Sequence, residues 1–120
     1  MTTPVGPYTP IVRAGEWLVC SGQIGIRDGA LVPGDLRAQL DQALANLAAL
    51  LETHGASISD IVKTTVFLVD MDDYGEMNEI YETFMATFGD KRPARSAVAV
   101  VGLPLGAIVE IEAWAYAPGL

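Results

Sequence analysis

The sequence predicts an α+β fold in which two helices pack on one face of a mixed β-sheet, in the order β-β-α-β-α-β-β. Two stretches carry apolar residues at helical spacing, and the segments around them are rich in β-branched residues and bounded by glycine or proline. With 120 residues, 51% of them apolar, and no internal repeat, the chain is expected to form one domain over residues 1–120.

The first predicted element is a β-hairpin. Residues 11–14 and 17–21 flank Gly15-Glu16, a tight-turn signal between two short apolar segments. Arg27-Asp28-Gly29 is predicted to turn the chain again before the first helix begins.

The first helix is predicted from Leu36 onward, for about five turns. Asp35 is suited to cap its first turn and Gly55 to end it. Its inward stripe repeats at intervals of three and four residues and comprises Leu36, Leu40, Ala43, Leu44, Leu47, Leu50 and Leu51.

A strand over residues 61–69 and a second helix follow. Asp73-Tyr74-Gly75-Glu76 resembles a capping box with an acidic cap residue, and Gly89 is expected to end the helix. Its inward stripe comprises Met77, Ile80, Tyr81, Phe84, Met85 and Phe88.

Two strands close the chain, and each carries a charged residue where strands normally place apolar ones. Alternation puts Arg95, Ala97, Ala99 and Val101 on one face of the first strand, and Glu110, Glu112, Trp114 and Tyr116 on one face of the second. The helices are expected to cover the face that carries Val62, Val66, Leu68, Val98, Val100, Val109 and Ile111. The opposite face, with Phe67, Lys63, Arg95, Glu110 and Trp114, is too apolar to remain in water, which predicts self-association through it.

Arg95 and Glu110 are the candidate chemical groups. An arginine can hold an anion by paired charge-assisted bonds, and a nearby carboxylate can act on water. Two alternatives stay open for these residues. Arg95 can form a structural salt bridge with Glu112, and Glu110 can be a solvated or ion-paired strand residue.

Composition excludes several classes of function. A net charge of -8 with seven scattered basic residues disfavours binding to nucleic acid or an anionic membrane. Without a long apolar run, a signal peptide or a partner for Cys20, we expect a cytoplasmic protein. His54 has no second ligand near it in sequence, and no phosphate-binding glycine motif occurs, so no metal or other cofactor is expected.

Six short motifs, in order between Gly6 and Ala115, resemble those of the RidA/YjgF family. Each motif alone is weakly specific, but six at family-like spacing are a specific signal. The motifs are Gly6-Pro7-Tyr8, Ser21-Gly22-Gln23-Ile24, Val62-Lys63-Thr64-Thr65-Val66-Phe67-Leu68, Asn78-Glu79-Ile80-Tyr81, Arg92-Pro93-Ala94-Arg95-Ser96, and Leu103-Pro104 through Val109-Glu110-Ile111-Glu112-Ala113.

The resemblance implies a chorismate-mutase-like α+β fold and a homotrimer with sites in the three clefts between subunits. It also implies cofactor-free hydrolysis of reactive 2-imino acids, such as 2-iminobutanoate and 2-iminopropanoate, to 2-keto acids and ammonia. The partner would then be a small anionic imino or keto acid, and the chain would be an imine deaminase.

The resemblance also implies roles for single residues. Arg95 matches the family's carboxylate-binding arginine and Glu110 its water-orienting glutamate. The other matching site positions are Tyr8, Ser21, Gly22 and Asn78, with Phe67 as a wall of the site. Ala97 departs from the cysteine of many members, which bears on substrate range, and Leu105 departs from a frequent lysine.

Three rival functions share this fold. The first is a non-enzymatic role, as a sensor of 2-keto acids or a chaperone-like partner-binding protein. The second is RNA cleavage, which the acidic charge opposes. The third is a different small-molecule reaction, for which Ala97 is the strongest hint.

Overall fold

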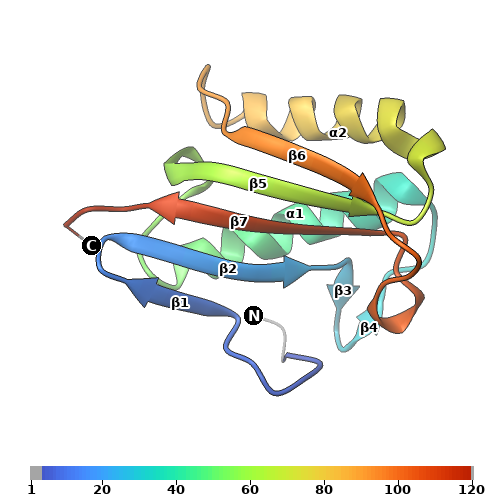
Figure 1. Cartoon of the computed structure of the whole chain (residues 1–120), viewed down its shortest axis with the longest axis horizontal. Coiled ribbons are helices and arrows are strands. Elements are labelled where there is room, and N and C mark those ends of the chain that lie inside the picture. Colours follow the sequence, from blue (N-terminus) through green and yellow to red (C-terminus); the bar gives the residue numbers. More distant parts are fainter. Residues whose placement is uncertain (1–3, 120) are drawn as a thin grey trace.

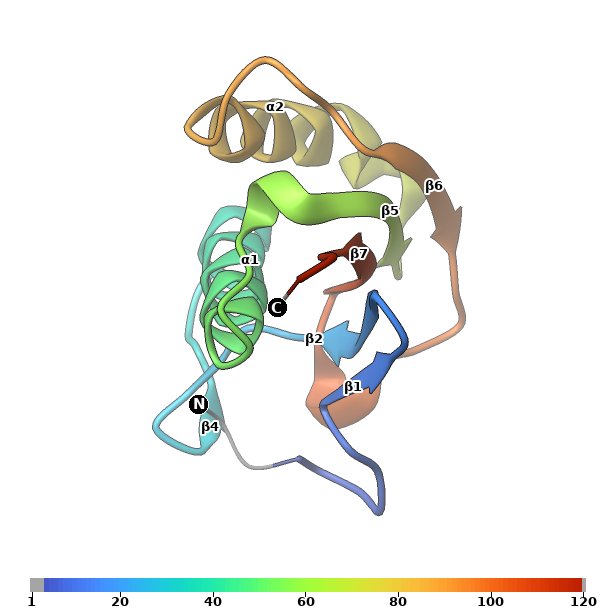
Figure 2. The same cartoon turned by 90° about the vertical axis from the view of Figure 1, so that its left-hand side faces the viewer.

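Two helices cover one face of a five-stranded mixed sheet in the computed structural model, which describes residues 4–119 (Figure 1). The strand order is β1-β2-β7-β5-β6, with β5 and β6 parallel and the other neighbours antiparallel. The main elements are β1 Ile11–Ala14, β2 Trp17–Gln23, α1 Leu36–Glu52, β5 Ile61–Leu68, α2 Tyr74–Ala86, β6 Ala94–Ala99 and β7 Val109–Tyr116. The predicted fold class is confirmed, and both helices lie on the same side of the sheet (Figure 2). Within residues 4–119 no helix is long and apolar enough to cross a membrane.

The two predicted turns before α1 are present. Gly15 adopts a φ of 61°, and Ala14 pairs with Trp17 on either side of the turn. Asp28 and Gly29 both adopt positive φ, 54° and 81°, as in a type I′ hairpin turn. The strands beside that turn, β3 Ile26–Arg27 and β4 Ala30–Leu31, form a small separate ribbon that the sequence did not predict.

Helix α1 forms as its pattern predicts. The Asp35 carboxylate accepts a hydrogen bond from the Ala38 N–H at 3.4 Å, and Gly55 lies just beyond the helix with a φ of 73°. Every residue of the predicted inward stripe is buried in the main core. This helix packs along β2 and β7 and beside α2.

The start of α2 differs from the prediction. A short 3₁₀ helix, η2 Met71–Asp73, leads directly into it, and the Asp73 side chain makes no capping hydrogen bond. The predicted capping box is therefore wrong, because the chain enters α2 already in helical conformation and has no extended cap residue. The cap moves upstream, where the Asp70 carboxylate accepts from the Asp72 N–H at 2.9 Å. Phe88 lies beyond the end of the helix and is exposed, so its predicted inward position is also wrong.

The predicted faces of β5 and β6 are partly wrong. The register of β5 against β7 shifts between Ile61 and Lys63, so Ile61 and Thr64 both point into the core while Val62 is exposed. In the parallel register Arg95 lies beside the buried Thr64, and Ala97 lies beside the buried Val66.

The strand register decides which side chains of β6 lie under the helices. Arg95 and Ala97 lie on the helix-covered face, and Val98, which was expected there, is exposed on the other. The predicted inward positions of Val66, Leu68, Val109 and Ile111 are confirmed by their burial.

The uncovered face of the sheet carries a row of aromatic side chains. Trp17, Trp114 and Tyr116 are 36%, 47% and 41% exposed, and the Trp17 ring lies 6.3 Å from that of Trp114 and 5.1 Å from that of Tyr116. Glu110 and Phe67 lie on the same face, towards its other end, and they pair across β7 and β5. We call this surface the open face.

Candidate functional site

The predicted site residues fall into two separate groups. Tyr8, Ser21, Gly22 and Glu110 line one cavity, with Phe67 beside Glu110 on the neighbouring strand. We call these five residues the glutamate half-site. Arg95 and Asn78 lie away from that cavity, on β6 and α2, and we call them the arginine half-site.

An irregularity in β2 shapes the glutamate half-site. The pairing of β2 with β7 slips between Cys20 and Gln23, so Ser21 and Gly22 leave the regular ladder. Gly22 lies directly against Glu110, and a Cβ atom there would come within 2.6 Å of the Glu110 Cδ atom. A glycine is therefore needed for the glutamate side chain to take this position.

The cavity beside Glu110 has a volume of about 260 Å³. The N-terminal segment supplies Val5 and Tyr8 to its wall, and the loop before β7 supplies Pro104. A cavity of this size is at the small end for ligand sites, which suits a molecule of few atoms.

The carboxyl group of Glu110 has a raised pKa. Partial burial is the main cause, and the negative charge of Glu112 on the same strand adds to it. A carboxyl group with such a pKa exchanges protons with bound water more readily near neutral pH than an ordinary glutamate does.

In the arginine half-site, neutral groups of α2 hold the guanidinium of Arg95. Its Nη2 donates to the Tyr74 hydroxyl at 3.1 Å and its Nη1 to the Met77 sulfur at 3.6 Å. Its central carbon lies 5.5 Å and 5.0 Å from the ring centres of Tyr74 and Tyr81. Within residues 4–119, the salt bridge present is the one between Arg92 and Glu82, so Arg95 is bound to no carboxylate there.

The alternative of a structural Arg95–Glu112 salt bridge is therefore not observed. Glu112 lies on the open face, beside Thr65, whereas Arg95 lies on the helix-covered face. The sheet itself separates the two side chains.

Each half-site contains a buried polar atom that has no hydrogen-bond partner in the described part of the chain. These atoms are Ser21 Oγ and Asn78 Oδ1. Native proteins pair nearly all such atoms, so an unpaired one needs a specific explanation. A ligand or a second protein chain at each half-site would provide the missing partner.

One chain does not bring the two half-sites together. Strand β5 lies between Arg95 and Glu110. Arg95 on β6 pairs with Thr64 of β5, whereas Glu110 on β7 pairs with Phe67, three residues further along β5. With the usual strand dimensions, the Arg95 and Glu110 Cα atoms are about 14 Å apart, and their side chains leave opposite faces. A small substrate cannot contact both residues of the same chain.

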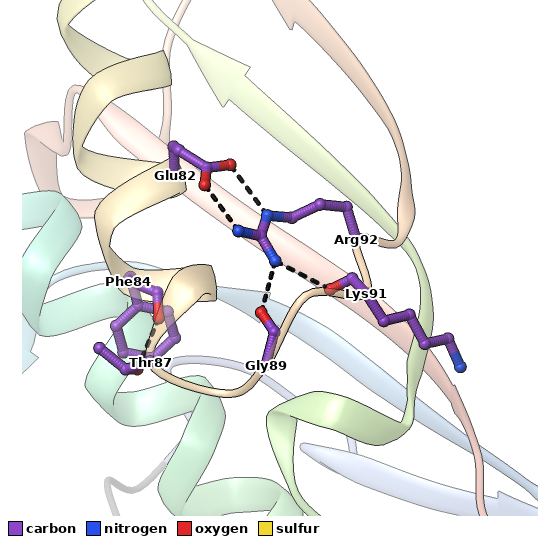
Figure 3. Close-up of polar contacts among 6 residues, drawn as sticks. All are labelled: Glu82, Phe84, Thr87, Gly89, Lys91 and Arg92. Carbon is purple, nitrogen blue, oxygen red and sulfur yellow. Dashed lines mark hydrogen bonds and ion pairs between the residues drawn. The ribbon is translucent and has the colours of Figure 1, made fainter.

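Sequence reasoning missed the residues that hold Arg95 in place. Arg92 binds the Glu82 carboxylate through two nitrogens, at 2.9 and 2.6 Å, and donates to the Gly89 carbonyl at 2.7 Å (Figure 3). It thereby ties the end of α2 to the start of β6, three residues before Arg95. The sequence pattern placed Tyr74 at the start of the second helix and gave it no role in the site. Its spacing is the signal that could have revealed a role, since residues 74, 77 and 81 share one helical face.

The thiol of Cys20 is poorly suited to act as a nucleophile. It is buried in the core, and burial raises its pKa to about 11. A thiol with that pKa is protonated at neutral pH and is a poor nucleophile.

The chain resembles known proteins over nearly its whole length. Residues 1–117 match the family model described as Endoribonuclease L-PSP. A RutC family protein of Pyrococcus horikoshii is 45% identical, covering 94% of this chain and 89% of the relative. A mouse protein named 2-iminobutanoate/2-iminopropanoate deaminase is 44% identical, covering 91% of this chain and 80% of the relative.

Solved structures agree with the sequence comparison. The YjgF gene product of Escherichia coli superposes with a TM-score of 0.89 at 42% identity, covering 94% of this chain and 90% of the other. Escherichia coli TdcF, solved with bound serine, has a TM-score of 0.89 at 36% identity over the same shares of the two chains.

Proposed function

Because the chain belongs to the Endoribonuclease L-PSP family, also called RidA/YjgF, we propose that it hydrolyses short 2-imino acids to 2-keto acids and ammonia. The substrates would be of the 2-iminobutanoate and 2-iminopropanoate type. Relatives that carry this deaminase name in mouse, rat and Escherichia coli are 42–44% identical to the chain.

The observation that carries the proposal is the environment of Arg95. Its guanidinium is partly buried, yet neutral groups hold it and no carboxylate neutralises it within the described residues. Such a group attracts an anion, and its planar fork matches the two oxygens of a carboxylate. In the proposed complex it binds the carboxylate of the imino acid and fixes the orientation of the C=N group.

Glu110 then acts on the water. It accepts a proton as the water oxygen bonds to the imine carbon, and the two electrons of the C=N π bond move to nitrogen, which takes up a proton. In the resulting tetrahedral intermediate the hydroxyl loses a proton and the amino nitrogen takes one up; the C–N bond then breaks as the C=O bond forms, so one imine and one water give one keto acid and one ammonia. The raised pKa of Glu110 suits this exchange of protons.

The two half-sites would meet across an interface between chains. Their separation within one chain supports this arrangement, as does the apolar open face, which a monomer would expose. A ring of three copies brings one surface of each chain against a different surface of the next, so that three equivalent sites form. Ser21 and Asn78, with their unpaired buried atoms, would come together in each of these sites.

A coupled assay tests the reaction. An amino-acid oxidase generates imines from a panel of amino acids, and semicarbazide traps them as semicarbazones. The protein competes with semicarbazide for each imine, so the decrease in the amount of semicarbazone formed measures hydrolysis. Arg95→Ala should reduce kcat/KM by roughly 30-fold to several thousand-fold, because losing a desolvated charge pair costs on the order of 2–5 kcal/mol. Arg95→Lys should recover little, because a point charge lacks the fork. Wild-type activity in either variant would contradict the assignment.

One relative supports a second candidate function. Escherichia coli TdcF was solved with bound serine, a small molecule that carries a carboxylate. The chain would then be a sensor that binds a 2-keto acid through Arg95 and does not turn over an imine. Arg95-dependent binding of 2-oxobutanoate without any loss of semicarbazone would favour this function over hydrolysis.

A further inference from the structure

Tyr74 contacts Arg95 of the arginine half-site, and the proposed function gives Tyr74 no role. It is the first residue of α2, and 41% of it is exposed. Its hydroxyl accepts from Arg95 Nη2 at 3.1 Å, and its ring lies 5.5 Å from the central carbon of the same guanidinium. One side chain therefore contacts Arg95 in two ways.

The contacts of Arg95 leave part of its hydrogen-bonding capacity unused. A guanidinium has five N–H groups, and the Tyr74 hydroxyl and the Met77 sulfur take one each. Within residues 4–119 the other three N–H groups have no side-chain partner, and they are enough for a paired interaction with a carboxylate. The contact to sulfur is weak and is easily exchanged for a ligand oxygen.

The chemistry of these partners is as informative as their positions. A carboxylate partner would fix the guanidinium but cancel its charge, and a substrate would have to displace it. Tyrosine rings attract a cation without carrying charge, and a hydroxyl accepts a hydrogen bond without neutralising it. The group formed by Tyr74, Met77 and the Tyr81 ring, which we call the neutral cradle, fixes Arg95 and leaves its charge available.

We infer that Tyr74 is a positioning residue that holds Arg95 in the orientation needed to bind the substrate carboxylate. The inference rests on the proposed role of Arg95. Tyr74 acts through its ring, which lies against the guanidinium, and through its hydroxyl, which fixes the rotation of the guanidinium plane. The remaining N–H groups are thereby directed away from α2, where a carboxylate can reach them.

The test measures binding of 2-oxobutanoate to the full chain by NMR titration, which follows affinities into the millimolar range. Tyr74→Phe keeps the ring and should weaken binding about 3- to 10-fold, the effect of one hydrogen bond. Tyr74→Leu also removes the ring and should weaken it roughly another 2- to 5-fold. Thr87→Val is the control and should leave the affinity unchanged, because it also removes a side-chain hydroxyl of α2, here bonded to the Phe84 carbonyl at 2.6 Å, but lies at the opposite end of the helix from Tyr74.

The dependence on Arg95 separates positioning from other roles. In an Arg95→Ala background, Tyr74→Phe should change the affinity by less than about twofold, since the group that it positions is gone. In the imine assay Tyr74→Phe should raise KM more than it lowers kcat, because the carboxylate is held equally in the ground and transition states.

Several results would overturn the inference. Equal weakening by Tyr74→Phe in both backgrounds would mean that Tyr74 contacts the ligand directly. A lowered melting temperature with unchanged affinity would mean that its role is only structural. If Arg95→Ala does not weaken binding, the proposed role of Arg95 fails and this inference with it. If binding depends on Arg95 and Tyr74 but no imine is hydrolysed, the inference stands and the proposed reaction alone fails.

Discussion

At the scale of single residues, Gly22 shows how a missing side chain places a functional group. The backbone of β2 bulges at Ser21 and Gly22, and the space that a Cβ atom would occupy is filled by the Glu110 carboxyl group. The conflicting atoms belong to a flexible side chain, and Gly22 has no positive φ that would require glycine. The site therefore needs this glycine, while the fold does not.

Gly22→Ala should accordingly separate activity from stability. The new methyl group forces Glu110 out of its position, and kcat in the imine assay should fall at least about tenfold, since small misplacements of a catalytic group are costly. The free energy of unfolding in urea should change by less than about 1 kcal/mol, because no buried core group is lost. A large loss of stability with retained kcat would mean that the glycine serves the fold.

Glu110→Gln tests the chemistry of the carboxylate itself. The amide keeps the size but cannot accept a proton, so kcat should fall by about 10²–10⁴ while 2-oxobutanoate still binds through Arg95. The wild-type kcat/KM should decline at low pH as Glu110 takes up a proton, at a higher pH than for an ordinary glutamate because its pKa is raised, and the variant should lack this decline. Glu112→Gln, two residues along the same face, is the control: it should leave kcat near neutral pH almost unchanged and move the decline at low pH to lower pH, because the Glu112 charge contributes to the raised pKa of Glu110. Full kcat in Glu110→Gln, or a greater loss in Glu112→Gln, would refute the role.

At the scale of elements, α2 connects the core to the arginine half-site. Residues 74, 77, 78 and 81 follow one another at helical spacing, so one face of the helix presents both the contacts to Arg95 and Asn78, whose Oδ1 atom has no hydrogen-bond partner among residues 4–119. A buried hydrogen bond of 2.7 Å between Thr64 and Tyr81 fixes this face against β5. The position of Arg95 thus depends on a polar contact inside the core.

The Thr64–Tyr81 hydrogen bond gives a prediction about stability. Tyr81→Phe or Thr64→Val alone leaves a buried hydroxyl without a partner and should lower the free energy of unfolding by about 1–3 kcal/mol. The double variant removes both hydroxyls with little change of shape and should recover most of that loss. Urea titration at one fixed protein concentration measures all four proteins. Simple addition of the two losses would mean that the hydrogen bond is not what stabilises the contact.

The sequence predicted elements better than it predicted faces. Leu36 to Leu51 follow the helical period so regularly that α1, its cap at Asp35 and its buried stripe were all predicted correctly. The faces of β5 and β6 depend on pairing with other strands, which the local pattern does not contain. The irregularity after Ile61 changes the phase of alternation, and the β6 register then turns Arg95 towards α2.

The local sequence pattern also leaves open which residues of the candidate site lie together in the folded chain. Its residues were selected by resemblance and by charge, and the structure does bring Tyr8, Ser21, Gly22 and Glu110 to one cavity. Sequence alternation alone placed Arg95 on the face of Glu110, whereas the sheet separates them. Helical spacing places Tyr74 on the face of Met77 and Tyr81, but it does not show that this face meets Arg95, which lies 21 residues away and contacts Tyr74 only in the folded chain.

At the scale of the whole molecule, the proposed association of chains would account for both the open face and the separation of the two half-sites. Both tryptophans of the chain, Trp17 and Trp114, lie exposed on that face, together with Tyr116. Association through the open face removes apolar surface from water, which stabilises the assembly by roughly 25 cal/mol for each Å² buried. The same contact can bring the arginine half-site of one chain to the glutamate half-site of the next, so assembly and activity should be lost together.

Complementation between two inactive variants tests this arrangement directly. Light scattering should first give about three times the 12.7 kDa mass of one chain for the wild type and for Arg95→Ala and Glu110→Gln. Each variant alone should be nearly inactive. When the two are co-expressed and assemble at random, a site is intact if one neighbour supplies Arg95 and the other supplies Glu110, which occurs in about a quarter of the sites of a closed ring. Co-expressed protein should therefore recover up to about that fraction of wild-type activity, while samples mixed without subunit exchange should not. If Arg95 and Glu110 of one chain served the same substrate, every site would keep one defect, and co-expression would recover nothing.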